Sequence, residues 1–294
     1  MEVIVSQLSA GLSLGSILLL AAVGLSLTFG QMGVINMAHG EFIMAGAYTA
    51  FTVQQVLGHA GVSLLLSIPI AFLVGGALGL LVEGLLLRRM YHRPLDTLLV
   101  TFGVSLVLQQ VARDVFGAPS VDVRLPELLQ GPVEVLGVPV PASRVFLLAL
   151  AVIVVAALAL VLHRTSLGRR VRAVVLSRDL AEVSGISSRR TDQLTFFIGS
   201  GLAGVAGVAL TLVGSTSPTL GTTYIVDAFL VVVAGGIGQI RGAVLAAAGL
   251  GVLQAFVEYS TTASIAKVLV LVAVVAFLQL RPQGIFSVRT RGLA

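Results

Sequence analysis

The sequence predicts an all-α, polytopic integral membrane protein, and three observations support this fold class. Of the 294 residues, 57% are hydrophobic and only 11% are charged, whereas soluble domains carry about 25% charged residues. The apolar runs are long and continuous, unlike the short alternating segments of a β-barrel. The arginines gather in the stretches between these runs. We therefore expect a single transmembrane domain over residues 1–294, with eight or nine transmembrane helices that include broken or half helices.

Nine apolar segments approach the length of a membrane-spanning helix, which is about 20 residues. They lie at residues 5–29, 39–57, 62–87, 95–112, 144–162, 194–214, 223–239, 242–258 and 265–280. The pairs that meet around residues 30–40 and 235–242 are alternatively half helices on either side of a break, which would lower the count.

Basic residues predict the orientation, because short cytoplasmic loops collect Arg and Lys. With nine spans, three arginine groups fall on one side of the membrane. They are Arg88, Arg89 and Arg93, the arginines between residues 164 and 190, and Arg281, Arg289 and Arg291. We expect this side, with the C-terminus, to be cytoplasmic. The longest outer segment, residues 113–143, is either a connector or a contact surface for a substrate-delivery protein, with a hairpin expected around residues 130–132.

The first break follows a clean apolar helix that ends at Phe29-Gly30. A short polar passage with Gln31, Asn36, His39 and Glu41 precedes the next apolar segment. Lipid cannot hydrogen-bond an open backbone, so such a break is tolerated only inside protein, beside a wet cavity or at a membrane surface. Clustered polar side chains at the break favour a permeation path. For Glu41, a buried hydrogen-bonded tie between the broken helices is an equally good interpretation.

Residues 224–250 show a similar pattern: Asp227 opens an apolar helix, glycines at 235–238 interrupt it, and a second helix starts at Gly242. Two similar breaks in the two halves of a chain are typical of transporters with internal repeats. Asp227 either caps or bonds to a neighbouring helix, or it lines a cavity. The glycines between residues 199 and 207 favour close helix packing over a ligand role.

The largest inner loop, residues 163–192, contains a predicted surface helix. Asp179 is expected to cap its start and Gly185 to end it. One interpretation is a basic anchor on anionic lipid headgroups. The other is a docking helix for a partner on the cytoplasmic face, which the length of the loop favours.

Several chemistries are absent from the sequence. It contains no Cys, which excludes disulfides and Cys-based metal sites. Its single Lys, Lys267, is not part of a Walker A motif, so this chain does not hydrolyse ATP by a P-loop mechanism. An enzyme is not expected, and neither is a cofactor in this chain. The net charge of +5 does not indicate nucleic acid, because the arginines flank the spans.

Most of the chain resembles a known family. Residues 24–48, GLSLTFGQMGVINMAHGEFIMAGAY, resemble the opening of the LivH-type permeases of branched-chain amino acid ABC importers. Other stretches resemble the urea branch of that family, the UrtB-type permeases. These are RPLDTLLVTFGVSLVLQQ at 93–110, FGAPSV at 116–121, SGLAGVAG at 200–207, YIVDAFLVVV at 224–233 and KVLVLVAVVAFLQLRPQGIF at 267–286.

The resemblance implies an inner-membrane permease subunit of a bacterial ABC importer that conducts urea. Its implied partners are a second homologous permease, two ATP-binding subunits that bind the ATP, and an extracytoplasmic substrate-binding protein. It also implies that the ATPase-docking helix contains Arg178, Asp179, Leu180, Ala181, Glu182 and Gly185.

Urea is uncharged, so its path requires polar side chains rather than a charge clamp. The candidates are Gln31, Asn36, His39, Glu41, Thr101 and Asp227. The alternative substrate is a branched-chain amino acid or a short amide. Two other classes stay open: a stand-alone channel or ion-coupled transporter, and an assembly protein without a path.

Overall fold

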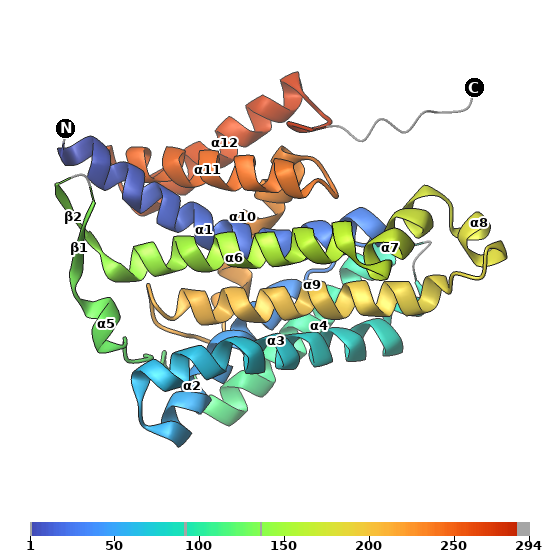
Figure 1. The fold of residues 1–294 in the computed structure, drawn as a ribbon, viewed down its shortest axis with the longest axis horizontal. Helices are drawn as coiled ribbons and strands as arrows, with labels where there is room; N and C mark the ends of the chain where they lie inside the picture. The colour runs from blue at the N-terminus through green and yellow to red at the C-terminus, as the bar shows by residue number, and fades with distance from the viewer. Residues whose placement is uncertain (1, 91–92, 136, 287–294) are drawn as a thin grey trace.

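The computed structural model describes residues 2–90, 93–135 and 137–286. It is a bundle of helices, which confirms the predicted fold class (Figure 1). The long helices are α1 (Glu2–Met32), α2 (His39–Leu57), α3 (Ala60–Leu85), α4 (Pro94–Phe116), α6 (Ala142–Arg164), α9 (Ser188–Leu210), α10 (Leu220–Gly235), α11 (Ile240–Ser260) and α12 (Ala263–Leu280). Each matches one predicted apolar segment. By length and composition seven of the described helices can cross a membrane, and α2 and α10 are not among them.

The ends of the bundle differ in character. The N-terminus and a small β-hairpin lie at one end, called here the hairpin end (Figure 1, left). Two short helices, α7 (Ser166–Leu176) and α8 (Arg178–Val183), protrude at the opposite end, called here the α8 end. The predicted inner loop therefore contains two helices rather than one. Arg289 and Arg291 lie outside the described residues.

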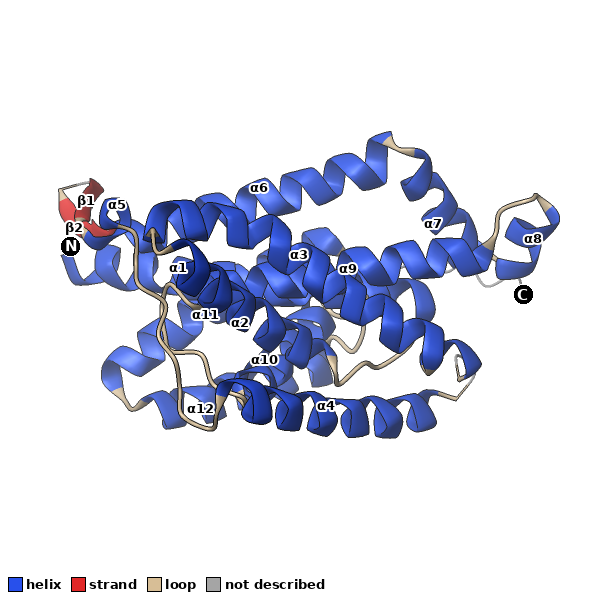
Figure 2. Ribbon diagram, turned by 90° about the horizontal axis from the view of Figure 1, so that it is seen from below, coloured by secondary structure: helices blue, strands red, loops and turns tan. Residues whose placement is uncertain are grey.

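The segment predicted to lie outside, residues 113–143, carries the only strands among residues 2–90, 93–135 and 137–286 (Figure 2). After the short helix α5 (Glu127–Gln130), β1 (Pro132–Val135) pairs antiparallel with β2 (Val138–Pro141), with Pro132 opposite Pro141. The turn of the hairpin was predicted at residues 130–132, but the first strand begins at Pro132. The prediction therefore placed the turn too early in the sequence. This hairpin is a small exception to an all-α fold.

The centre of the bundle is built from α1 and α9, which run antiparallel: Gln31 contacts Asp192, and Gly24 contacts Gly199. The small residues of α9 allow close packing, as the sequence predicts. A Cβ at Gly204 would overlap the carbonyl oxygen of Ala71 in α3. Without side chains at such crossings, dispersion contacts between the backbones hold the helices together.

The short helices α2 and α10 start inside the bundle rather than at its ends. Gly40, at the start of α2, packs backbone to backbone against Gly221, at the start of α10. From there α2 runs beside α4 toward the hairpin end, where Tyr48 stacks on Phe116. In the other direction α10 runs beside α1, where Phe229 contacts Phe29. The two N-termini therefore meet, and the helices run to opposite ends.

The second break differs from the prediction. The stretch that precedes the half helix α10 is residues 211–219, at the hairpin end of α9. The predicted break at 235–242 is instead a tight turn between α10 and α11, in which Gly236 and Gly238 adopt positive φ angles of 101° and 75° that other residues rarely tolerate. The chain after α12 covers this turn: the Ile285 N–H donates to the carbonyl of Ala234 (2.9 Å).

Candidate functional site: a polar seam between α2 and α4

The break between α1 and α2, residues 33–38, is an irregular segment whose backbone bonds to side chains. The Ala38 N–H donates to Asn36 Oδ1 (3.0 Å), and the Met37 N–H donates to Thr101 Oγ1 of α4 (3.1 Å). Thr101 in turn donates to the carbonyl of Thr97 (2.8 Å). Both predicted path residues, Asn36 and Thr101, therefore hold the break in shape, which satisfies the backbone where lipid cannot.

Helix α4 lies along one edge of the bundle (Figure 2) and carries a stripe of polar residues. Thr97, Thr101, Ser105 and Gln109 follow one another at every fourth position and are all buried. Residues four apart lie on one face of a helix. That face is turned toward the break and α2, whereas Leu99, Phe102 and Leu106 on the other face are exposed. Of the stripe, sequence analysis found only Thr101, although the four-residue spacing is visible in the sequence.

Glu41 joins this stripe to the start of α2. Its Oε1 accepts hydrogen bonds from Ser105 Oγ (2.8 Å) and from Gln109 Nε2 (3.0 Å). Its Oε2 lies over the start of α10, since a Cβ added at Gly221 would be only 2.8 Å from it. Acidic groups are stabilised near helix N-termini, and here two N-termini meet. We call Asn36, Glu41, Thr101, Ser105 and Gln109 the polar seam.

His39 lies beside the seam rather than in it. Its Nε2 is 3.1 Å from the carbonyl oxygen of Ala21 in α1, and its ring contacts Phe42 edge to face. Three buried polar atoms near this point, Asn36 Nδ2, His39 Nδ1 and Glu41 Oε2, have no hydrogen-bond partner in the described part of the chain. Buried polar atoms are nearly always hydrogen-bonded, so each such atom requires an explanation.

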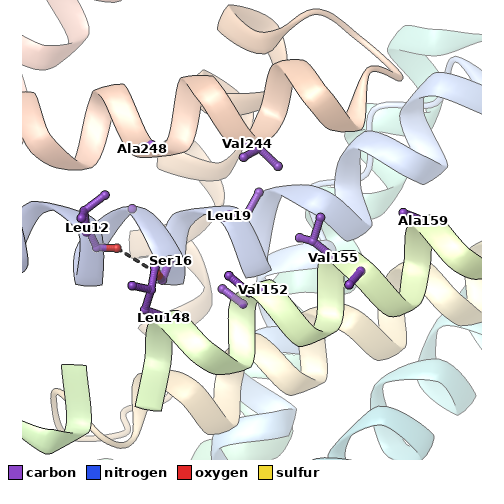
Figure 3. Close-up of a pocket in the computed structure, with 12 residues that line it drawn as sticks. Leu12, Ser16, Leu19, Leu148, Val152, Val155, Ala159, Val244 and Ala248 are labelled. Atoms are coloured by element: carbon purple, nitrogen blue, oxygen red, sulfur yellow. Dashed lines mark hydrogen bonds between the residues drawn. The ribbon is translucent and has the colours of Figure 1, made fainter. Parts of the chain in front are cut away.

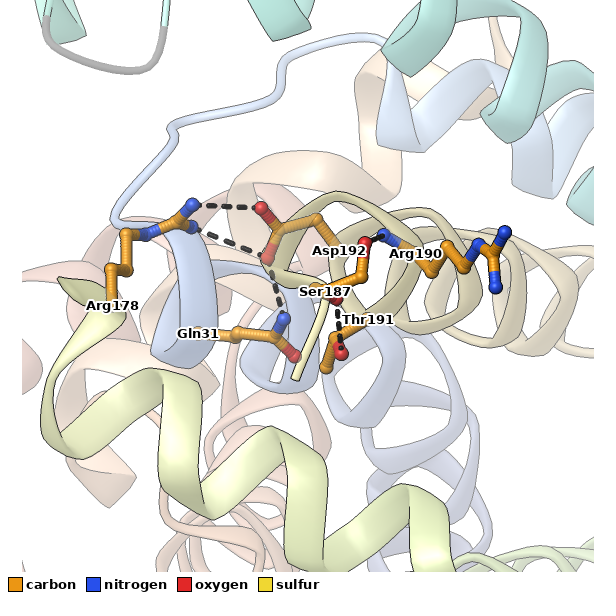
Figure 4. Close-up of polar contacts among 6 residues, drawn as sticks. All are labelled: Gln31, Arg178, Ser187, Arg190, Thr191 and Asp192. Carbon is orange, nitrogen blue, oxygen red and sulfur yellow. Dashed lines mark hydrogen bonds and ion pairs between the residues drawn. The ribbon is translucent and has the colours of Figure 1, made fainter. Parts of the chain in front are cut away.

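The other two predicted path residues lie elsewhere. Gln31 is near the α8 end of α1, where its Nε2 donates to Asp192 Oδ1 (2.6 Å), and Asp192 also binds Arg178 (Figure 4). Asp227 of α10 faces α12, with its Oδ2 3.6 Å from Lys267 Nζ. The structure therefore brings Asn36, Glu41 and Thr101 together, places His39 next to them, and separates Gln31 and Asp227 from them.

The predicted docking residues are on or beside α8. The helix is capped by Ser177, whose Oγ accepts from the Leu180 N–H (3.3 Å), and not by Asp179 as predicted, because the helix begins one residue before Asp179. Gly185 ends it as predicted, with φ at 80°. Its N–H donates to the carbonyl of Glu182 (2.9 Å). The side chain of Arg178 is turned inward to Asp192.

Three apolar side chains are the most exposed large hydrophobic ones on α7 and α8. Leu176, Leu180 and Val183 have 87%, 68% and 88% of their surface exposed, whereas Ala181 is buried. Asp179 and Glu182 are exposed beside them. We call Leu176, Leu180 and Val183 the α8 knob. Sequence analysis found only Leu180 of the three.

Two hollows lie away from the seam. The first, about 340 Å³, is an apolar groove between α1, α6 and α11 (Figure 3). Its polar side chain, Ser16, donates to the carbonyl of Leu12 in its own helix. The second, about 440 Å³, lies at the hairpin end and includes Arg144, Glu258 and Tyr259. None of the predicted path residues lines either hollow.

Comparison with known proteins decides the family. Residues 7–278 match the family model described as "Branched-chain amino acid transport system / permease component". The chain belongs to this permease family. It is therefore a transport subunit and not an enzyme.

Curated relatives of this permease come from several organisms. It is 33% identical to the high-affinity branched-chain amino acid permease protein BraD of Pseudomonas aeruginosa, over 85% of both chains. It is 29% identical to LivH of Escherichia coli K12, over 96% of this chain and 94% of LivH. It is 26% identical to the probable LivH of Methanocaldococcus jannaschii, over 93% and 89% of the two chains. No solved structure gave a significant match.

These comparisons confirm the permease part of the predicted resemblance. They do not support its urea branch, because the relatives above are named for branched-chain amino acids. Apart from residues 116–121, the stretches that suggested the urea branch lie mostly in helices, and one of them, residues 93–110, contains Thr101, Ser105 and Gln109 of the polar seam.

Proposed function

We propose that this chain is a permease subunit of a bacterial ABC importer for branched-chain amino acids, and that the polar seam borders the translocation path. The observation that carries the proposal is the position of Glu41. It is an acidic side chain, fully buried among membrane-spanning helices, at the point where two helix N-termini meet. Ionisable residues inside a membrane are costly and usually mark substrate pathways.

The chemistry of the seam suits a zwitterion. Glu41 offers an acceptor for an ammonium group, and charge-assisted hydrogen bonds of this kind are strong. The N-termini of α2 and α10 offer N–H groups to a carboxylate, as discontinuous helices do in other transporters. Uncharged urea needs neither feature. The family and the names of its relatives support the same substrate class.

In this structure the seam is closed, because its polar groups bond to one another. We propose that the path opens when α4 separates from α2. Ser105 and Gln109 then exchange their bonds to Glu41 for bonds to the substrate. The unpartnered atoms Asn36 Nδ2, His39 Nδ1 and Glu41 Oε2 support a solvated or occupied state of this region.

We propose that the α8 end faces the cytoplasm and the hairpin end faces outward, in a multi-pass subunit of the inner membrane whose C-terminus is cytoplasmic. The arginine-rich loop at the α8 end supports this orientation. A second homologous permease, two ATP-binding subunits and an extracytoplasmic substrate-binding protein complete the proposed transporter. ATP is bound by the partner subunits, and lipid surrounds the bundle.

We propose that the α8 knob docks on an ATP-binding subunit. Three apolar side chains so exposed on two protruding helices are typical of an interaction site. Val183→Glu is expected to abolish co-purification of the ATP-binding subunits without loss of the folded permease. Leu128→Glu is the matched control, because Leu128 is equally exposed at the opposite end. Undiminished co-purification with Val183→Glu would contradict the docking role.

The substrate is tested by uptake into proteoliposomes that contain the complete transporter. Radiolabelled leucine and urea are supplied with the substrate-binding protein outside and ATP inside. We expect ATP-dependent leucine uptake and no urea uptake above empty liposomes. Urea uptake without leucine uptake would overturn the proposal, as would uptake by this chain alone without ATP.

A further inference from the structure

A partly buried cluster at the α8 end connects three segments of the chain (Figure 4). Arg178 Nη1 lies 2.8 Å from Asp192 Oδ2 and its Nη2 lies 3.2 Å from Oδ1. Gln31 Nε2 donates to the same Oδ1 at 2.6 Å. We call these three residues the Asp192 cluster. It joins the first residue of α8 to the first turns of α9 and to the last turn of α1.

The geometry of the cluster makes it a stiff connection. The side chain of Asp192 is 1% exposed, and the guanidinium group of Arg178 binds its carboxylate through two hydrogen bonds. Bidentate arginine–carboxylate pairs fix both distance and orientation. A partly buried pair also resists separation, since removing one partner leaves a buried charge without compensation. Motion of α8 is therefore passed to Asp192 rather than absorbed by loose side chains.

The third member connects the cluster to the polar seam. Gln31 is followed by Met32 and then by the break at residues 33–38, and the Gly33 N–H still donates to Phe29 at the end of α1. The break is bonded to Thr101 of α4 and leads directly into Glu41. A shift at Gln31 therefore reaches the seam through fewer than ten residues of chain.

We infer that the Asp192 cluster couples the docking helix α8 to the gate at the polar seam, with Asp192 and Gln31 as positioning residues. This inference rests on the proposed function. ATP-driven movement of a docked partner displaces α8, and Arg178 pulls Asp192 and the end of α1 with it. The break then shifts relative to α4 and the seam opens.

The test is the ratio of leucine uptake to ATP hydrolysis in the reconstituted transporter. Asp192→Asn keeps the shape and an oxygen acceptor for Gln31 but removes the ion pair. We expect ATP hydrolysis to continue and uptake per ATP to fall by about tenfold, within the usual range for coupling between two sites. Gln31→Met keeps the ion pair and cuts only the connection to α1, and should lower the ratio similarly.

The double variant Asp192→Asn/Gln31→Met should be no worse than either single variant, because both interrupt the same connection. Arg190→Met is the matched control, since Arg190 is on the same helix turn, points away from Asp192 in Figure 4 and has no side-chain partner among the described residues. Its ratio should equal that of the wild type.

Other outcomes overturn the inference. A purely structural cluster predicts that uptake and hydrolysis fall together with the amount of folded transporter, at an unchanged ratio. If the Asp192→Asn transporter does not assemble, the Gln31→Met variant alone tests the inference. A wild-type ratio of leucine uptake to ATP hydrolysis in that variant would refute the coupling. Absence of ATP-driven leucine uptake in the wild-type transporter would refute the proposed function, and the inference with it.

Discussion

The rings of Tyr48 in α2 and Phe116 in α4 are stacked, with centroids 4.2 Å apart and an angle of 13° between their planes. Phe51 contacts the same Phe116 ring edge to face. These aromatic contacts close the polar seam toward the hairpin end, so that Glu41, Ser105 and Gln109 lie between an aromatic lid and the break. In the proposed function, this aromatic lid shuts the path toward the hairpin end until α4 separates from α2.

Phe116→Ala should therefore destabilise the closed seam. Aromatic stacking contributes about 0.5–1.5 kcal/mol beyond area burial, so we expect a clearly lower thermal stability in detergent. Tyr48→Phe is the control, because it keeps the stack and removes a hydroxyl that has no partner among the described residues. Equal stability of the two variants would contradict a role for the stack.

Glu41→Ala should destabilise the protein by leaving Ser105 Oγ and Gln109 Nε2 without their acceptor. A buried polar group without its partner costs about 1–3 kcal/mol. The control is Gln110→Ala, which removes only an exposed bond to Asp114 on the same helix. The measurement is the temperature at which half of the purified permease stays monodisperse. If Gln110→Ala lowers this temperature more than Glu41→Ala does, the hydrogen bonds of the seam do not stabilise the protein.

Gly221→Ala should separate the starts of α2 and α10. The added Cβ would lie 2.5 Å from the backbone of Gly40, which cannot move aside as a flexible side chain can. Overpacking of this kind costs about 1–3 kcal/mol. Gly249→Ala, in α11, has open space around its added Cβ and should be neutral or slightly stabilising. The same thermal assay distinguishes them, and a stable Gly221 variant would argue against the tight crossing.

Because Asp227 and Lys267 form an ion pair, we expect their substitutions to have non-additive effects on the amount of protein in the membrane. Lys267→Met leaves an acidic group unpaired among apolar helices, where a charge costs about 2.5–3.5 kcal/mol on insertion scales. The double variant Asp227→Asn/Lys267→Met removes both charges and should accumulate in the membrane better than Lys267→Met alone. If the double variant accumulates less than the single one, the two residues do not act as a pair.

Much of the fold was predictable, because helix length and apolarity are local properties. All nine apolar segments form helices, and the second begins and ends at residues 39 and 57 as predicted. What failed depends on three-dimensional context. Glycines at 236 and 238 suit either a buried break or a tight turn, and only the neighbouring chain distinguishes them. The stretch at 211–219, TLVGSTSPT, is rich in Ser and Thr but has no amide or ionisable side chain, so it predicted only a loop between two spans.

The candidate site was predictable in part for a similar reason. Asn36 and Glu41 stand out beside a break, and Thr101 was found through its polarity. Ser105 and Gln109 were missed because each is a single polar residue in an apolar helix. Only their four-residue spacing from Thr101 indicates that they share one face of that helix. The pairing of Arg178 with Asp192 joins residues from two helices across a loop, which the sequence alone does not specify.

The bonds from Ile285 and Phe286 to the carbonyls of Ala234 and Gly235 also have a meaning for biogenesis. Those carbonyls close helix α10, yet their donors leave the ribosome only after α11 and α12 have been made. While the chain is being inserted, the C-terminal end of α10 is therefore incomplete and must be covered by water or by the insertion machinery. Final closure of this end is a late event in assembly, completed when the segment after α12 folds back.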